Sequence, residues 1–237
     1  SVIAGDEMFD YMADTYSAED GEYRLVLSIS GEGSSIGRID YADLTGDGRM
    51  ELLVSWQISS GVSVLSVYSL SDWSGDVLLS TDSTEFVTGD INRDGRDELM
   101  NLRAANSTTY LIDQYTFADG EIPQAATAAL SAEISALQRL RMVTLAGNSP
   151  ALLAESTLTN GDLVSDLFVC RDGSLINLTM NRSTQISETR RSYSLVFAQD
   201  IDGDGVTEIP CPLGDSAAEQ TDGLVSWMSW QSDGRFQ

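Results

Sequence analysis

Residues 90–98 read Asp-Ile-Asn-Arg-Asp-Gly-Arg-Asp-Glu, and this stretch decides the fold because its pattern occurs three times in the chain. Residues 43–51 read Asp-Leu-Thr-Gly-Asp-Gly-Arg-Met-Glu, and residues 200–208 read Asp-Ile-Asp-Gly-Asp-Gly-Val-Thr-Glu. All three fit Asp-(Leu/Ile)-x-x-Asp-Gly-x-x-Glu. A pattern that returns in this way predicts a chain built of similar supersecondary units.

The spacing of the three copies predicts a fourth unit. The copies begin at 43, 90 and 200, so the first interval is 47 residues and the second, at 110, is about two such intervals. Residues 143–153 lie where the missing copy should be, and they keep the apolar flanks without any carboxylate. We therefore expect four units that begin near 43, 90, 144 and 200, with the one at 144 degenerate.

The segments between the loops are typical of β-strands. Residues 62–68 and 162–170 are rich in β-branched and apolar side chains that partly alternate with polar ones. Gly/Asp turns at 74–76, 118–120 and 171–173 separate such runs. Four short antiparallel strands in about 50 residues are typical of a propeller blade. The fold class predicted is all-β, a β-propeller of about four to five four-stranded blades.

Three segments fit the repeat less directly. Residues 125–142 place Leu130, Ile134 and Leu137 at helical spacing, but their place in the repeat predicts a strand from about Gln138. Residues 8–30 and 192–237 each resemble half a blade. The whole chain, 1–237, would then be a single propeller. Either these halves pair to close the ring, or the chain is part of a longer propeller; the sequence leaves both open.

Composition excludes several classes of function. The chain has 237 residues and a net charge of −24, and its 13 basic residues are all arginine, with no lysine or histidine. A histidine base, a Schiff-base lysine and a P-loop lysine are therefore excluded. The negative charge argues against nucleic acid and anionic lipid as partners. No apolar run approaches the length of a membrane span, so we expect no direct membrane insertion of this chain.

The ends and the cysteines are less informative. Residues 1–6 lack the features of a signal peptide, so the sequence leaves open a cytosolic protein or one that has been exported and processed. Cys170 and Cys211 both lie in apolar surroundings, which favours two buried free thiols over a disulfide.

The acidic loops have the chemistry of a hard-cation site. Carboxylates at alternate positions, followed by a glycine that permits a sharp bend, direct several oxygens into one turn, as Ca²⁺ requires. The EF-hand is excluded because its twelfth position needs glutamate, whereas Val54, Asn101 and Cys211 stand there. The acid comes instead at the ninth position, and the loops lead into strands. Acidic turns without an ion are the alternative, but clustered carboxylates repel each other unless a cation is present.

These loops resemble the FG-GAP/VCBS repeats of integrin-like β-propellers, in particular the VCBS-repeat surface lipoproteins of gut Firmicutes. The resemblance implies a bacterial calcium-binding propeller, exported and lipid-anchored at the cell surface through a segment absent here. Thr45 departs from the usual Asp/Asn, so the first site would be weaker or would use the hydroxyl. Carried over by position, the calcium ligands would be Asp43, Thr45, Asp47, Glu51 and the Arg49 carbonyl; Asp90, Asn92, Asp94, Glu98 and the Arg96 carbonyl; and Asp200, Asp202, Asp204, Glu208 and the Val206 carbonyl.

The resemblance implies a module for binding or adhesion to an unidentified protein or glycan at the cell surface. The alternatives are a structural scaffold domain of a larger surface lipoprotein and a glycan-binding module. Four tryptophans, Trp56, Trp73, Trp227 and Trp230, could stack on sugars, but in a propeller they would more often pack between blades. The prominent acids are assigned to metal loops and no second acidic constellation stands out, so we expect no enzyme activity.

Overall fold

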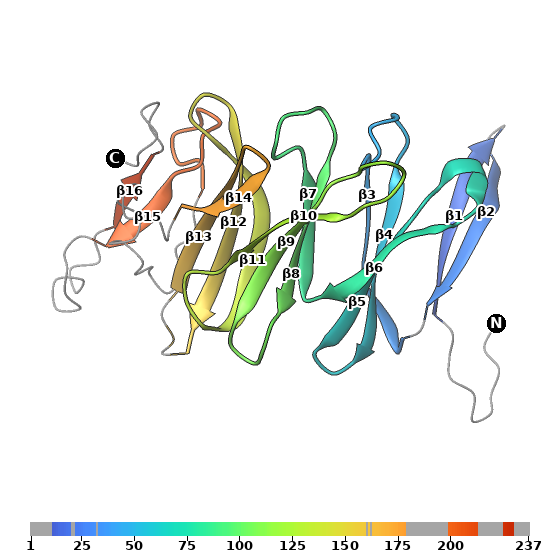
Figure 1. The fold of residues 1–237 in the computed structure, drawn as a ribbon, viewed down its shortest axis with the longest axis horizontal. Coiled ribbons are helices and arrows are strands. Elements are labelled where there is room, and N and C mark those ends of the chain that lie inside the picture. The colour runs from blue at the N-terminus through green and yellow to red at the C-terminus, as the bar shows by residue number, and fades with distance from the viewer. Residues whose placement is uncertain are drawn as a thin grey trace.

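A computed structural model describes residues 11–19, 22–31, 33–159, 161, 163–178, 199–212 and 225–229 (Figure 1). These residues form β-strands and a single 3₁₀ turn, η1 (Ser71–Trp73). The all-β prediction is therefore confirmed for this part of the chain. The described residues include no helix long and apolar enough to cross a membrane.

Three four-stranded antiparallel sheets form the middle of the molecule, and in each of them every strand pairs with the next along the chain. The first sheet comprises β3 (Ser35–Ala42), β4 (Glu51–Ser59), β5 (Val62–Tyr68) and β6 (Val77–Ser83). The second comprises β7 (Glu85–Gly89), β8 (Glu98–Ala104), β9 (Tyr110–Tyr115) and β10 (Gln124–Ala129). The third comprises β11 (Ile134–Leu145), β12 (Ser149–Leu158), β13 (Leu163–Arg171) and β14 (Ser174–Asn177).

Two smaller sheets flank these three in Figure 1. One is the hairpin of β1 (Tyr11–Glu19) and β2 (Glu22–Gly31), and the other pairs β15 (Ile209–Pro212) with β16 (Val225–Met228). They lie at opposite ends of the row of sheets. Pairing of the two half-blades to close a ring is therefore not found among the described residues. Parts of the expected half-blades, residues 8–10, 20–21, 192–198, 213–224 and 230–237, lie outside the described residues.

From the β1–β2 hairpin to the third four-stranded sheet, neighbouring sheets stack face to face, and their side chains form a core at each of these junctions. Successive residues of a strand point to opposite faces, so Leu52 and Val54 of β4 pack toward Ile29 of β2, while Leu53 packs toward Phe86 of β7. The first four residues of β4 are all buried for this reason. Covering both faces of a sheet explains the continuous apolar runs in the second strands of the repeats.

Trp56 shows how closely two sheets approach. Its side chain is only 2% exposed and lies in the core between the β1–β2 hairpin and the first four-stranded sheet. A Cβ added to Gly31 would stand 2.3 Å from the Trp56 ring. Glycine at position 31 is therefore required by this packing, because any side chain would displace the indole.

The segment with helical spacing folds as strands, and β11 begins at Ile134 rather than near Gln138. Register shifts occur between Ile134 and Ala136 and between Leu137 and Arg139. Each bulge inserts a residue that breaks the alternation of side chains between faces. The helical spacing therefore arises without a helix, because Leu130 lies in the connection before β11 while Ile134 and Leu137 lie in the bulged part of that strand.

Candidate metal-binding loops

The first two acidic repeats each connect the first and second strands of a four-stranded sheet, and the third precedes a strand. The loop 43–51 joins β3 to β4, and the loop 90–98 joins β7 to β8. The loop 200–208 leads into β15, and Gln199 bridges to Glu208 across it. The turn between β11 and β12 occupies the same place in the third sheet. All four connections lie along one edge of the stacked sheets (Figure 1).

The first loop is organised by its own carboxylates. Asp43 accepts backbone N–H bonds from Gly46 (2.7 Å) and Gly48 (2.9 Å), and Asp47 accepts one from Arg49 (2.8 Å). Glu51 accepts N–H bonds from Leu44 (2.8 Å) and Thr45 (3.2 Å). The Thr45 hydroxyl lies 3.4 Å from Glu51 Oε1, so threonine at the third position does turn its hydroxyl toward the acidic cluster.

The second loop repeats this arrangement. Asp90 accepts N–H bonds from Asp94 and Gly95, both at 3.0 Å, and Asp94 accepts one from Arg96 at 3.0 Å. Asn92 supplies the third-position side chain, whose Nδ2 donates to Glu98 Oε1 at 2.7 Å. The Glu98 carboxylate also accepts N–H bonds from Ile91 (3.1 Å) and Asn92 (3.3 Å).

The third loop brings its carboxylates closest together. Asp200 accepts N–H bonds from Gly203 (2.7 Å) and Gly205 (2.9 Å), and Asp204 accepts one from Val206 (2.7 Å). Carboxylate oxygens of Asp200, Asp202 and Glu208 lie within 4.8 Å of one another, with Glu208 buried and the two aspartates exposed. This group could hold a metal ion.

The glutamates at the ninth position are buried, which makes their charged form unfavourable. Glu51 is 3% exposed and Glu98 is completely buried. Burial, together with the nearby Asp94 and Asp90, raises the pKa of Glu98 to about 7 against the lowering effect of its N–H donors. Burial also raises the pKa of Glu51, to which Asp43 and Asp47 add. Among the described residues, no arginine pairs with Glu51, Glu98 or Glu208.

These observations fit a cation bound by the carboxylates of the loops. A buried carboxylate is normally paired with a cation or ligates a metal. In each loop, one buried glutamate shares a turn with two or three aspartates and forms no ion pair with an arginine among the described residues, whereas Asp94 of the second loop pairs with Arg96 at 3.2 Å. The side chains at positions 1, 3 and 5 of each loop carry oxygen atoms, and oxygen donors are what Ca²⁺ binds.

Backbone bonds tie neighbouring loops together along the edge. The Asp97 N–H donates to the Asp43 carbonyl at 3.2 Å, which links the second loop to the first. The Thr207 N–H donates to the Thr144 carbonyl at 2.8 Å, which links the last loop to the degenerate one. Both bonds run from the eighth position of one repeat to the first position of another. At the middle junction, Arg93 donates to the carbonyls of Gly147 and Asn148.

The degenerate repeat forms the predicted strand–turn–strand without carboxylates. Gly147 and Asn148 adopt positive φ angles of 73° and 54° in the turn between β11 and β12. Leu145, at its second position, is fully buried, as are Leu44 and Ile91 at the second positions of the first two loops. The apolar second position is therefore common to the loops that bear carboxylates and the one that does not.

The other candidate residues have separate surroundings. Trp56 is a core residue, whereas Trp73 is 44% exposed. Trp227 lies in β16, and Trp230 lies outside the described residues. Cys170 is a free, half-buried thiol whose pKa is raised by burial. The strands expected at 62–68 and 162–170 are β5 and β13.

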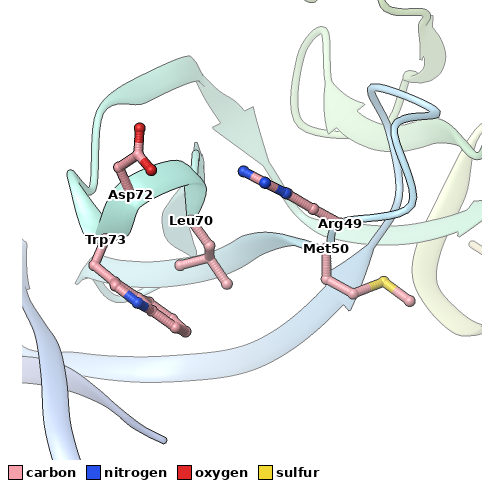
Figure 2. A pocket seen from close by; sticks show the side chains of 5 residues that line it. All are labelled: Arg49, Met50, Leu70, Asp72 and Trp73. Atoms are coloured by element: carbon pink, nitrogen blue, oxygen red, sulfur yellow. The ribbon is translucent and has the colours of Figure 1, made fainter.

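Sequence reasoning missed a surface pocket beside the first loop (Figure 2). It is a hollow of about 460 Å³ lined by Arg49, Met50, Leu70, Asp72 and Trp73. The first two of these residues belong to the acidic loop and the others to the segment around η1. No motif spans the twenty or so residues between them, so only the position of Trp73 next to a Gly/Asp turn could have pointed to it.

No family model and no curated relative matches the chain. Among solved structures, the chain is similar to the rhamnogalacturonan lyase PL11 of Bacillus licheniformis, with a TM-score of 0.54 and 15% identity over 87% of this chain and 49% of that one. It is also similar to an exo-type rhamnogalacturonan lyase, with a TM-score of 0.54 and 17% identity over 83% and 45%. At these identities the likeness concerns the fold alone, and the chain spans about half the length of either enzyme.

Proposed function

We propose that this chain is a calcium-binding β-propeller module of the FG-GAP/VCBS type, which acts in binding or adhesion at a bacterial cell surface and has no catalytic role. The observation that carries the proposal is the set of three acidic loops with matching hydrogen bonds along one edge of the sheets. In each of them a buried glutamate shares one turn with several aspartates, and no arginine of the described residues forms an ion pair with that glutamate.

Calcium bound in these loops would have a structural role. The side chains at positions 1, 3, 5 and 9 of each loop, with the carbonyl at position 7, would supply the oxygens. Their backbone N–H bonds already hold the carboxylates at positions 1, 5 and 9 within the turn. A cation there would relieve the repulsion between carboxylates and would hold the connection to the second strand of the unit.

Stacking of four-stranded antiparallel sheets in chain order supports the propeller part of the proposal. Propeller blades are such sheets, each packed against the next around an axis. Within a propeller of about four to five blades, the hairpin β1–β2 and the pair β15–β16 would be half-blades.

The proposed location follows from the calcium chemistry and the family resemblance. Extracellular calcium is concentrated enough to occupy weak sites, so loops of this kind suit an exported, lipid-anchored protein. The partner would be a protein or glycan at the cell surface.

Thermal unfolding in excess EDTA and in millimolar calcium tests the proposal. A site filled at a hundredfold excess over its Kd stabilises the folded state by about 2.7 kcal/mol, which corresponds to a rise in Tm of roughly 5–10 °C for a domain of this size. The variant Asp94→Asn/Asp204→Asn should lose most of the rise. The control Asp119→Asn/Asp172→Asn removes the same two charges from hairpin turns and should keep it. Equal Tm values of the wild type in calcium and EDTA would refute the metal assignment.

A glycan-binding module is the second candidate function, favoured by the likeness of the fold to two rhamnogalacturonan lyases. Binding of rhamnogalacturonan oligosaccharides without cleavage would support it. Release of unsaturated sugar products, followed by ultraviolet absorbance, would instead show lyase activity and contradict the expectation of a non-catalytic chain. A structural scaffold domain would give neither result.

A further inference from the structure

We infer that the pocket between the first acidic loop and η1 binds an acidic sugar, a hexuronate unit of an oligosaccharide. Arg49 and Met50 line one side of this pocket, and Leu70, Asp72 and Trp73 line the other (Figure 2). The inference goes beyond the proposed calcium-binding role, and it stands or falls on the pocket alone.

Arg49 is the feature that points to an acid. In a chain with a net charge of −24, Arg38, Arg96, Arg103, Arg139 and Arg141 form ion pairs with carboxylates, whereas no ion pair among the described residues involves Arg24, Arg49, Arg93 or Arg171. Of these four, Arg49 lines the pocket, and Figure 2 shows its guanidinium extended toward the η1 segment. A planar guanidinium without an ion-pair partner in the described part of the chain is suited to a bidentate bond with a carboxylate.

Trp73 supplies an apolar face on the side of the pocket opposite this cation. Its side chain is 44% exposed, whereas Trp56 is buried. In Figure 2 the Leu70 side chain lies between the indole and Met50, so these three residues form the apolar part of the lining. A broad aromatic surface with a polar neighbour matches a sugar ring, which offers C–H groups on one face and hydroxyls at its rim.

The backbone around Trp73 is held in an unusual conformation. Asp72 and Trp73 have φ angles of 54° and 57°, which non-glycine residues seldom adopt. The turn is maintained by the Trp73 N–H bond to the Leu70 carbonyl (3.2 Å) and the Ser69 N–H bond to the Asp76 carbonyl (2.8 Å). Strained backbone of this kind is concentrated at ligand-binding sites. Here it places an exposed indole across the pocket from Arg49, which forms no ion pair with a carboxylate of the described residues.

Asp72 distinguishes a uronate from a simple anion. Its carboxylate would repel an inorganic phosphate or sulfate that binds Arg49. In contrast, a hexuronate presents a carboxylate to Arg49 and hydroxyl groups that can donate to Asp72. A single hexuronate would thus contact the Arg49 guanidinium, the Asp72 carboxylate and the apolar face of Trp73.

Isothermal titration calorimetry with trigalacturonate, with neutral galactotriose and with inorganic phosphate tests the inference on the wild type in calcium. Trigalacturonate should bind saturably, and at least about tenfold more tightly than galactotriose, because a charge-assisted bidentate bond is lost with the neutral sugar. Undetectable binding of trigalacturonate would overturn the inference. Equal affinity for galactotriose would overturn the inference that the sugar is acidic. Equal affinity for phosphate would show that the pocket binds simple anions, and would overturn the inference that it recognises a sugar.

Substitutions test whether trigalacturonate binds in this pocket. Arg49→Gln should weaken trigalacturonate binding about tenfold and leave the Tm unchanged. Arg171→Gln removes the same charge from an exposed position at the end of β13, in another sheet, and should change the affinity for trigalacturonate less than twofold. Trp73→Ala should weaken binding of any sugar, and Trp73→Phe should restore part of it, which separates loss of stacking from loss of folding. Unaltered binding by Arg49→Gln would overturn the inference. Since calcium-dependent melting is measured separately, failure here leaves the calcium result intact.

Discussion

The connection from β7 to β8 and the connection from β11 to β12 hold the same place in neighbouring sheets, but only the first contains carboxylates. Gly89 pairs with Glu98 across a separation of nine residues, as Ala42 does with Glu51 and Gln199 with Glu208. In the third sheet, Val143 pairs with Ala151 across only eight. The degenerate repeat is therefore one residue shorter, and a buried alanine stands where the others have a buried glutamate.

This difference distinguishes the residues that the fold requires from the residues that would bind an ion. Both connections keep a buried apolar residue at the second position, Ile91 in one and Leu145 in the other. The strand–turn–strand unit forms at 143–151 without any carboxylate, so the unit itself does not require them. The buried Glu98 is unfavourable for the fold unless something compensates its charge, which is why the comparison supports a metal in the loops that kept their carboxylates.

The largest expected effect is on the pH dependence of stability without metal. Because the pKa of Glu98 is raised from 4.5 to about 7 in the folded state, the folded state holds its proton more tightly than the unfolded one. In EDTA the free energy of unfolding should then be greatest below pH 4.5 and should fall as the pH rises toward 7, by roughly 3 kcal/mol for this group. Chemical denaturation at several pH values measures the slope.

Added calcium and the substitution of Glu98 are the two controls for the pH dependence of the free energy of unfolding. Saturating calcium should abolish the fall in stability toward neutral pH, because the ion takes the place of the proton on Glu98. Glu98→Gln should flatten the slope in EDTA, and Glu133→Gln, at an exposed position, should leave it unaltered. A wild-type stability that rises between pH 4.5 and 7 in EDTA would contradict the electrostatic picture of the loop.

A loop exchange tests the comparison directly. Replacing residues 90–98 by the degenerate sequence 144–151 should leave a folded protein in EDTA, at least as stable as the wild type, because the buried carboxylate is gone. Calcium should then stabilise the variant by about 2.7 kcal/mol less than the wild type at a hundredfold excess over Kd. Thermal unfolding with and without calcium measures both. A variant that cannot fold in EDTA would show that the carboxylates are needed by the fold itself.

A smaller change should strengthen the first loop. Thr45→Asp adds a carboxylate at the third position, where the last loop has Asp202. We expect the Kd for calcium in this loop to fall about tenfold, with a lower Tm in EDTA because the new charge adds to the repulsion around Glu51. Calcium titration in the Asp94→Asn/Asp204→Asn background isolates the site, and Thr45→Asn is the uncharged control. An unchanged Kd would exclude the third position as a ligand.

The smallest effect concerns the link between the two compared connections. Arg93→Ala removes the bonds from the second loop to the Gly147 and Asn148 carbonyls. Since the side chain is exposed, the expected loss is about 1 kcal/mol in the free energy of unfolding. Calcium affinity should not change, because Arg93 is not among the proposed ligands. A large loss of affinity would mean that the link positions the acidic loop.

The sequence alone determined the repeated units, their boundaries near 43, 90, 144 and 200, and the groups in each acidic loop. These follow from interactions within nine residues, where a carboxylate meets the N–H groups of its own turn, so local spacing was enough. The start of β11 at Ile134 was not predictable, since bulges against β12 shift the alternation, and residues of a partner strand decide where they form.

Tertiary structure alone decided the rest. Whether Trp56 is buried and Trp73 exposed depends on which sheet covers each of them, and composition carries no such information. The link from Arg93 to the degenerate turn and the pocket shared by Arg49 and Trp73 join residues distant in the chain. Contacts of this kind exist only when the sheets have stacked, because packing of side chains between sheets, and not local backbone preference, sets the distance between one repeat and the next.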